Sequence, residues 1–301
     1  HTVSDVIGRT KVRHTVVTSI GELLGLKGIL VDFVLRHVKK MVPKFSLPGS
    51  IRLSDALADG RKRSLTRLPL GHEDIAFLQY TGGTTGVAKG AMLTHRNIVS
   101  NLSQAFEWIK PFVREGEETI FTALPLYHIF ALTANCLTFM RLGATNVLIP
   151  NPRDIPGFVK ELGKYRFSIL TGVNTLFNAL LNDPNFGRLD FSALKITLGG
   201  GMAVQKAVAD RWAEVTGKPL IEAYGLTETS PAATMNPLDL KEYNGSIGLP
   251  GPGTDVAIRD DDGKDLALGQ AGEICVRGPQ VMKGYYNRPD ETAKVLMPDG
   301  F

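Results

Sequence analysis

Between residues 119 and 225, short apolar runs alternate with amphipathic segments, and this alternation constrains the fold more than any other feature. The apolar runs have the length and the Val, Ile, Thr and Phe content of buried strands. They occupy residues 119–122, 145–150, 167–173, 194–201 and 219–225. The segments after the middle three runs carry apolar residues at helical spacing, and they occupy residues 155–165, 174–182 and 203–217. Alternating strands and helices with short links are typical of an α/β domain with a largely parallel sheet.

The composition and the residue pattern of the chain change on both sides of this region. This change predicts that the chain has three parts. Residues 1–74 form a partial N-terminal subdomain, and residues 75–236 form the α/β part. Residues 237–301 are rich in Gly and Pro and carry short alternating runs, with a hairpin signal "DDG" at Asp261–Gly263. We therefore expect a small β-rich, barrel-like subdomain at residues 237–301.

The N-terminal part is strongly basic. Residues 1–70 contain 13 Lys and Arg against 5 Asp and Glu, whereas the rest contains 21 against 25, which together give the net charge of +4. The segment Leu26–Phe45 predicts an amphipathic helix that Pro43 ends. Its apolar face comprises Leu30, Phe33, Val34, Val38 and Met41. Two interpretations stay open: a surface that meets anionic lipid, or an ordinary surface helix with a solvated basic face.

The stretch "LQYTGGTTGVAKGAML" (Leu78–Leu93) places a loop of glycines and threonines between two apolar runs. It is not the phosphate loop of motor proteins and GTPases, because Lys89 is followed by Gly90 and not by Ser or Thr. Glycines let backbone N–H groups approach an anion, threonine hydroxyls add donors, and Lys89 adds one positive charge. The alternative is a plain hairpin loop. Thr94 is the expected N-cap of a helix from about His95 to Trp108.

Two further motifs follow predicted strands, where open α/β sheets bind ligands. In "EAYGLTETSP", Glu228 is a hard oxygen ligand suited to Mg²⁺, Thr227 can hydrogen-bond a phosphate, and Tyr224 offers a flat face for a purine. In "LKITLGGG", Gly200 and Gly201 let a planar ring lie against the backbone. The alternatives are a turn with a solvated glutamate and a tight strand-to-helix turn.

Together these motifs resemble the adenylate-forming superfamily, in which "YTGGTTGVAKG" matches the phosphate loop and "YGLTE" the adenine and Mg²⁺ motif. "GEICVRGPQVMKGYYNRPDET" matches a later motif, and "TALPLYHIFALT" and "TGVNTLFNALLN" resemble bacterial long-chain fatty acid–CoA ligases (acyl-CoA synthetases). The resemblance implies stacked mixed and parallel β-sheets flanked by helices, as an incomplete large domain of that family. The family's ribose-binding Asp and its mobile C-terminal domain with a catalytic Lys would lie beyond Phe301.

The resemblance also implies roles for residues in the matched motifs. The catalytic positions are Thr84, Lys89, Thr227 and Glu228, of which Thr84 and Glu228 are the expected metal ligands. The expected nucleotide-binding positions are Thr81, Gly82, Gly83, Thr84, Thr85, Gly86, Lys89, Gly200, Gly201, Tyr224, Gly225 and Thr227. The expected substrate-binding positions are Tyr127, His128, Gly172, Asn174 and Gly201. A set of apolar residues could line a tunnel for an alkyl chain. The alternative, for most of them individually, is that they belong to the ordinary core. They are Phe130, Leu132, Phe139, Leu176, Phe177 and Leu180.

The activity implied is ATP-dependent activation of a fatty acid to acyl-AMP with release of pyrophosphate, followed by transfer to coenzyme A. ATP or AMP, Mg²⁺ and coenzyme A are the expected cofactors and co-substrates. Alternatives are a medium-chain or aryl acid–CoA ligase, or, for these 301 residues alone, a non-catalytic piece that binds nucleotide or acyl chain.

We expect a cytoplasmic protein that associates peripherally with the inner face of the membrane, and we leave a homodimer open. Cys136 and Cys275 lie far apart, which fits free thiols in a reduced compartment. Nucleic acid is not an expected partner, because aromatic residues do not interleave with the basic ones.

Overall fold

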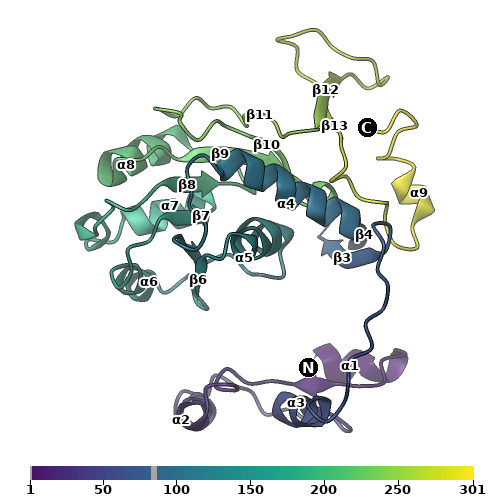
Figure 1. Cartoon of the computed structure of the whole chain (residues 1–301), viewed down its shortest axis with the longest axis vertical. Coiled ribbons are helices and arrows are strands. Elements are labelled where there is room, and N and C mark those ends of the chain that lie inside the picture. The colour runs from purple at the N-terminus through teal and green to yellow at the C-terminus, as the bar shows by residue number, and fades with distance from the viewer. Residues whose placement is uncertain (1, 83–86) are drawn as a thin grey trace. The chain divides into compact units, whose positions relative to one another are not determined.

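The computed structural model describes residues 2–82 and 87–301. The chain divides into two compact units, His1–Pro69 and Leu70–Phe301, which are described separately (Figure 1). The boundary between them lies near the end of the predicted N-terminal part. The three-part division itself remains a prediction.

The first unit is built from short elements. They are α1 (Thr2–Val6), η1 (Ile7–Arg9), β1 (Val16–Val17), α2 (Leu26–Phe33), the π-helical η2 (Val34–Val38), β2 (Ile51–Arg52) and α3 (Leu53–Gly60), with β1 and β2 parallel. The helix predicted to run up to Pro43 ends earlier, so that prediction was wrong at its C-terminal end. Lys40 adopts a left-handed conformation (φ 50°), and the Met41 N–H donates to the Leu35 carbonyl at 2.9 Å. This pattern terminates a helix before any proline is reached.

The second unit is organised around a seven-stranded sheet with the order β11-β10-β9-β8-β7-β5-β6. Its strands are β5 (Thr119–Thr122), β6 (Thr145–Leu148), β7 (Ile169–Gly172), β8 (Ile196–Gly199), β9 (Ile221–Gly225), β10 (Ala232–Met235) and β11 (Leu249–Pro250). Strands β5 to β9 are parallel, whereas β10 and β11 are antiparallel additions at one edge. The predicted α/β class with a mostly parallel sheet is confirmed.

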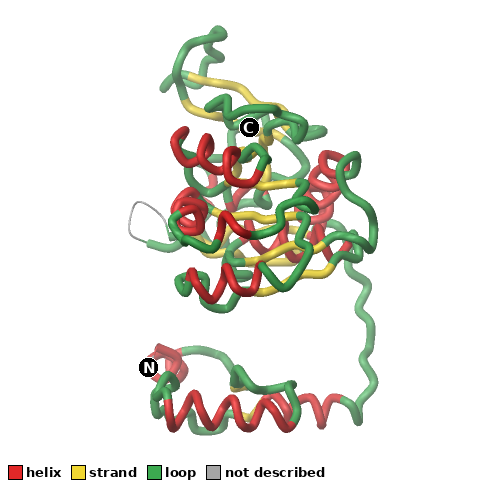
Figure 2. The backbone as a smooth tube through the Cα atoms, turned by 90° about the vertical axis from the view of Figure 1, so that its left-hand side faces the viewer, coloured by secondary structure: helices red, strands yellow, loops and turns green. Residues whose placement is uncertain are grey.

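Helices cover both faces of this sheet (Figure 2). They are α4 (His95–Ile109), η3 (Ala131–Leu137), α5 (Thr138–Arg141), α6 (Ile155–Leu162), α7 (Asn174–Leu181), η4 (Phe186–Arg188) and α8 (Lys206–Thr216). Adjacent strand residues point to opposite faces. Phe121 and Leu170 therefore pack with α6, α7 and α8, whereas their neighbours Ile120 and Ile169 pack with α4 and α5.

The hairpin β3 (Ile75–Thr81) and β4 (Lys89–Thr94) leads directly into α4, as predicted, and Thr81 lies opposite Lys89. Thr94 caps α4: the Asn97 N–H donates to its hydroxyl at 3.2 Å, and the Thr94 N–H donates to Asn97 Oδ1 at 2.8 Å. This reciprocal cap satisfies donors that the helix start would otherwise leave unpaired. It fixes where β4 ends and the helix begins.

The last part of the chain contains η5 (Thr227–Thr229), the antiparallel pair β12 (Asp255–Arg259) and β13 (Glu273–Arg277), and α9 (Pro289–Thr292). The "DDG" turn forms, with the Gly263 N–H donating to the Asp260 carbonyl at 2.9 Å. The wider barrel-like arrangement of residues 237–301 remains a prediction, since β11 belongs to the large sheet and β12–β13 is a two-stranded pair.

Candidate functional site

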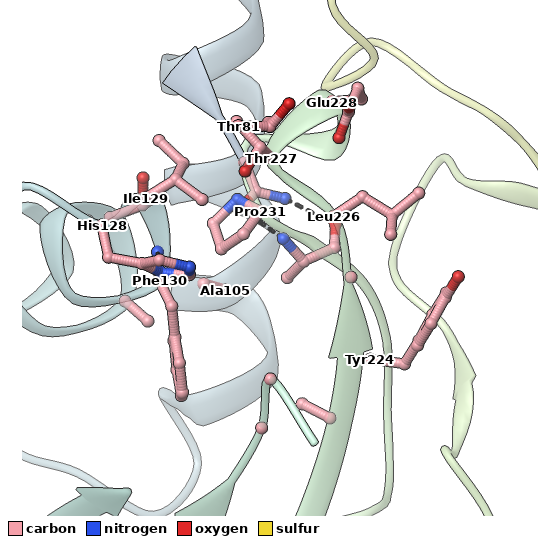
Figure 3. A pocket seen from close by; sticks show the side chains of 18 of the residues that line it. Thr81, Ala105, His128, Ile129, Phe130, Tyr224, Leu226, Thr227, Glu228 and Pro231 are labelled. Atoms are coloured by element: carbon pink, nitrogen blue, oxygen red, sulfur yellow. Dashed lines mark hydrogen bonds between the residues drawn. The ribbon is translucent and has the colours of Figure 1, made fainter. Parts of the chain in front are cut away.

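A cavity of about 550 Å³ lies at the carboxyl ends of β8 and β9, the expected ligand-binding edge of an open α/β sheet. Its wall combines the end of β8, the β9–η5 turn, the β3–β4 hairpin, the start of η3, helix α4 and one tyrosine from the last part of the chain (Figure 3). The lining residues are Thr81, Gly82, Lys89, Asn101, Ala105, His128–Ala134 except Ala131 and Leu132, Leu198, Gly200, Gly201, Ala223–Glu228, Pro231, Ala232, Met235 and Tyr285.

The turn after β9 projects Thr227 and Glu228 to one end of this cavity. A Cβ atom on Gly225 would lie 1.8 Å from the Pro231 carbonyl oxygen, so only glycine fits there. The Leu226 N–H donates to the same carbonyl at 3.1 Å and closes the turn. Figure 3 shows Thr227 and Glu228 beside Thr81 of the hairpin, with His128 and Phe130 on another wall.

Glu228 is held by a tyrosine from a distant segment. The Tyr285 hydroxyl donates to Glu228 Oε1 at 2.6 Å, and the Met282 N–H donates to the Glu228 carbonyl at 2.8 Å. Burial, and then the hydrogen bond to Glu228, raise the pKa of the Tyr285 phenol above its ordinary value. The phenol therefore remains the proton donor of this pair at neutral pH.

One acidic side chain of the cavity wall, Glu228, could act as a ligand of a metal ion. Over residues 2–82 and 87–301, no group of three or more His, Cys, Asp or Glu side chains is placed to hold a metal. Mg²⁺ commonly binds through one or two carboxylates, with phosphates and waters as the other ligands. Among the described lining residues, Glu228 offers one carboxylate, which suits that arrangement.

Lys89 brings a positive charge to the same end of the cavity. Its Nζ lies 2.5 Å from Glu291 Oε2 and 5.2 Å from the centroid of the Tyr285 ring. Glu291 also accepts from Lys294 Nζ at 2.7 Å. Hydrogen bonds from Lys294 and then Lys89 lower the pKa of Glu291 to about 2, so this carboxylate is charged throughout the neutral range.

The glycines after β8 leave room at the cavity wall. A Cβ on Gly200 would lie 3.1 Å from the Phe130 ring, and Gly201 has a left-handed backbone (φ 76°). Tyr224 lies across the turn with a half-buried ring, and burial followed by the Glu228 charge raises the pKa of its phenol. Bare backbone and a tyrosine face are surfaces on which a planar ring can lie.

The structure brings most of the predicted site residues together. Those that line the cavity are Thr81, Gly82, Lys89, His128, Gly200, Gly201, Tyr224, Gly225, Thr227 and Glu228. Four predicted residues, Gly83, Thr84, Thr85 and Gly86, lie outside the described residues.

Three predicted substrate contacts are not brought to the cavity wall. Tyr127 is 81% exposed, and its backbone carbonyl accepts a hydrogen bond from the Gln79 side chain. Asn174 begins α7 and accepts from the Gln205 N–H at 2.9 Å, which fixes the segment after the glycines. Gly172 faces the Phe177 ring in the main core.

Most of the apolar residues considered for an alkyl tunnel are ordinary core. Leu176, Phe177 and Leu180 pack with the helices on one face of the sheet, whereas Phe139 packs on the other. Phe130 alone of that set lines the cavity.

Sequence reasoning missed several residues of the wall, including Asn101, Ile129, Thr133, Met235 and Tyr285. Tyr285 had a usable signal, because it lies in the "MKGYYNRPDET" run that carried the family resemblance. Thr133 had no signal in the sequence. Its buried hydroxyl lacks a hydrogen-bond partner among the described residues, and this is visible only in the three-dimensional structure.

Comparison with known proteins identifies the family of the chain. The model of the AMP-binding enzyme family matches residues 31–286, and the chain therefore belongs to that family. It is 58% identical over 297 residues to a long-chain-fatty-acid–CoA ligase of Yersinia pestis and 38% identical over 284 residues to one of Bacillus subtilis. These matches cover 98% and 93% of this chain but 53% and 50% of the relatives, so the chain spans about half the length of these ligases.

Solved structures show the same fold. The inhibitor-bound N-terminal domain of FACL13 from Mycobacterium tuberculosis matches with a TM-score of 0.75 and 25% identity, over 99% of this chain and 72% of that one. ATP-bound MatB from Rhodopseudomonas palustris matches with a TM-score of 0.74 and 27% identity, over 95% of this chain and 55% of that one.

Proposed function

We propose that the protein is a long-chain fatty acid–CoA ligase. One observation carries the proposal: a single cavity combines a lysine and a carboxylate at one end with bare glycine backbone and an apolar wall. This combination suits a nucleoside triphosphate and an apolar acid that bind next to each other. The similarity to proteins named long-chain-fatty-acid–CoA ligases supports the same conclusion.

The first step would join the acid to the nucleotide. A carboxylate oxygen attacks the α-phosphate of ATP, the bond to the β-phosphate oxygen breaks, and pyrophosphate leaves with its electron pair. Lys89 would balance charge on the leaving phosphates, and Thr227 would hydrogen-bond the α-phosphate. Gly200, Gly201 and Tyr224 would hold the adenine ring.

Glu228 would bind the Mg²⁺ ion, which would neutralise phosphate charge when bound. In the second step, the thiol of coenzyme A gives up its proton to solvent and its sulfur attacks the acyl carbon of the adenylate. The bond from this carbon to the phosphate oxygen breaks, and AMP leaves with the electron pair as the thioester forms. Neither step needs a nucleophile from the protein.

The wall of the cavity favours an apolar acid over an amino acid. Ile129, Phe130, Ala134, Leu198 and Met235 contribute carbon surface. Among the described lining residues, Glu228 is the only Asp or Glu, and the metal role uses it. An amino-acid substrate would require a further carboxylate for its ammonium group.

The test is ATP–pyrophosphate exchange by the intact protein with palmitate, octanoate, benzoate and acetate as matched acids. We expect the highest kcat/KM with palmitate. Exchange driven best by octanoate or benzoate would replace the proposal with the medium-chain or aryl alternative, and no exchange with any acid would reject adenylation.

We also propose that the first unit binds the surface of anionic membranes through the amphipathic segment Leu26–Phe45. Leu26, Ile29, Leu30 and Phe33 of α2 are all more than half exposed, and Lys39 and Lys40 follow closely. Among the described residues, no helix has both the length and the apolarity to cross a membrane. Co-sedimentation with phosphatidylglycerol vesicles should rise with their anionic content and fall with salt, and binding that ignores both would contradict the proposal.

A further inference from the structure

The ion pair between Lys89 and Glu291 is unlike most ion pairs of this protein. The two side chains are only 18% and 14% exposed, and their charged atoms lie 2.5 Å apart. Most other pairs among the described residues, such as Lys206–Asp210, join residues that are three or four positions apart in the sequence. Removing charges from water is costly unless they are paired, so Lys89 and Glu291 hold each other in place.

This pairing matters because of where Lys89 lies. Among the described residues that line the cavity, Lys89 is the only Lys or Arg. Glu291 already neutralises its charge. A polyphosphate that approaches this end of the cavity therefore meets a lysine with an occupied partner, together with a carboxylate that repels it.

Glu291 has alternative partners of its own. Lys294 Nζ lies 2.7 Å from Glu291 Oε1, and an Arg288 nitrogen lies 4.0 Å from the same oxygen. Both cations are more exposed than Lys89. If Lys89 turned toward an anion, Glu291 would keep a countercharge, which makes an exchange of partners energetically feasible.

We infer that Glu291 is the resident counter-ion of Lys89, which the phosphates of an incoming nucleotide displace. Glu291 is then a positioning residue. It orders the Lys89 side chain before the nucleotide binds, and it lowers the affinity of Lys89 for pyrophosphate afterwards. The inference rests on the proposed phosphate role of Lys89.

The sign of one substitution tests this inference. Glu291→Gln removes the competing charge but keeps an oxygen that can accept from Lys89. We expect the Kd of inorganic pyrophosphate for the 301-residue chain, measured by calorimetry with Mg²⁺ present, to fall about fivefold. A purely structural role predicts the opposite, since loosening the site would weaken binding.

A neighbouring residue provides the matched control. Asp290→Asn removes the same charge one residue away, but Asp290 pairs with Arg288 and not with Lys89. Its effect on the Kd should stay below twofold. Glu291→Gln should also lose its effect when combined with Lys89→Met, because the competition requires the lysine. Glu291→Asp, with a shorter side chain, provides a second variant and should tighten binding partially.

The outcomes separate this inference from the proposed function. If Lys89→Met weakens pyrophosphate binding but Glu291→Gln and Glu291→Asp bind no tighter than wild type, the counter-ion role is rejected and the phosphate site stands. If Asp290→Asn tightens binding as much as Glu291→Gln, general electrostatics explains the effect and the inference fails. If the wild-type chain binds neither pyrophosphate nor Mg-ATP, both are rejected.

Discussion

The hydroxyl of Tyr285 donates to the carboxylate of Glu228 at 2.6 Å, and the ring of the same tyrosine lies against the ammonium of Lys89, 5.2 Å from its centroid. One side chain thus sets the positions of the proposed metal ligand and the proposed phosphate-binding lysine. Met282 and Glu291 add contacts from the same segment. The segment after β13 is therefore part of the site, although it lies far along the chain from both motifs.

Removing the Tyr285 hydroxyl should weaken Mg²⁺ binding at the proposed metal site, while the tyrosine ring still lines the cavity. In Tyr285→Phe the ring still packs, but the Glu228 carboxylate loses the donor that orients it. We expect the Mg²⁺ concentration for half-maximal ATP–pyrophosphate exchange by the intact protein to rise about tenfold. Tyr286→Phe, one residue away and outside the cavity wall, is the control. An equal response of the two variants would contradict the orienting role.

Gly225→Ala should strongly destabilise the second unit. The new Cβ would lie 1.8 Å from the Pro231 carbonyl oxygen, and a backbone atom cannot move aside as a side chain can. We expect a loss of at least about 3 kcal/mol in the free energy of unfolding, measured by urea denaturation. Gly187→Ala meets its nearest atom at 3.8 Å and should change this free energy by less than about 1 kcal/mol.

Two threonines of neighbouring helical turns should respond to valine in opposite directions. Thr133 is 1% exposed, and its hydroxyl has no hydrogen-bond partner among the described residues. Thr133→Val should therefore raise the free energy of unfolding by about 1 kcal/mol. The equally buried Thr138 hydroxyl donates to the Thr133 carbonyl at 2.8 Å, so Thr138→Val should lower it by about 1 kcal/mol. Stabilisation by both changes would show that Thr138 gains nothing from its bond.

The charge on Glu291 should contribute stability in a defined pH range. Its pKa falls from 4.5 to about 2 in the folded chain, chiefly through Lys294 and then Lys89. A carboxylate with a lowered folded-state pKa stabilises the fold fully above the unfolded value, and this contribution is lost as pH falls through the folded value. The difference in Tm between wild type and Glu291→Gln should therefore be constant from pH 7 to about 5 and shrink towards pH 2. A difference that grew with acidity would contradict the pairing.

Helix ends were predicted well where residues next to the end determine it. Helix α8 ends at Gly217, whose left-handed backbone (φ 69°) closes the last turn, and Thr94 caps α4 as expected. The helix at Leu26 was harder to predict, because its end depends on a left-handed Lys40 that carries no strong sequence signal.

The site was predictable to the extent that its motifs are contiguous. "YGLTE" brings Tyr224 and Glu228 to the cavity because the turn between them is local. The role of Asn174 could not be read in this way, since it depends on where the Gln205 backbone returns in three dimensions. The same holds for Tyr285 and Glu291, whose partners lie in other motifs.

Strand β4 has one edge paired with β3 and the other with the segment around Tyr285. The Met92 N–H donates to the Gly284 carbonyl at 2.9 Å, and the Tyr286 N–H donates to the Gly90 carbonyl at 2.8 Å. On the ribosome, this second edge cannot be covered by its own chain until Tyr286 has been synthesised. A nascent chain that pauses earlier exposes an open strand edge, which invites pairing with other chains. Completion of the cavity wall and protection of this edge therefore both depend on synthesis of the segment that contains Tyr285.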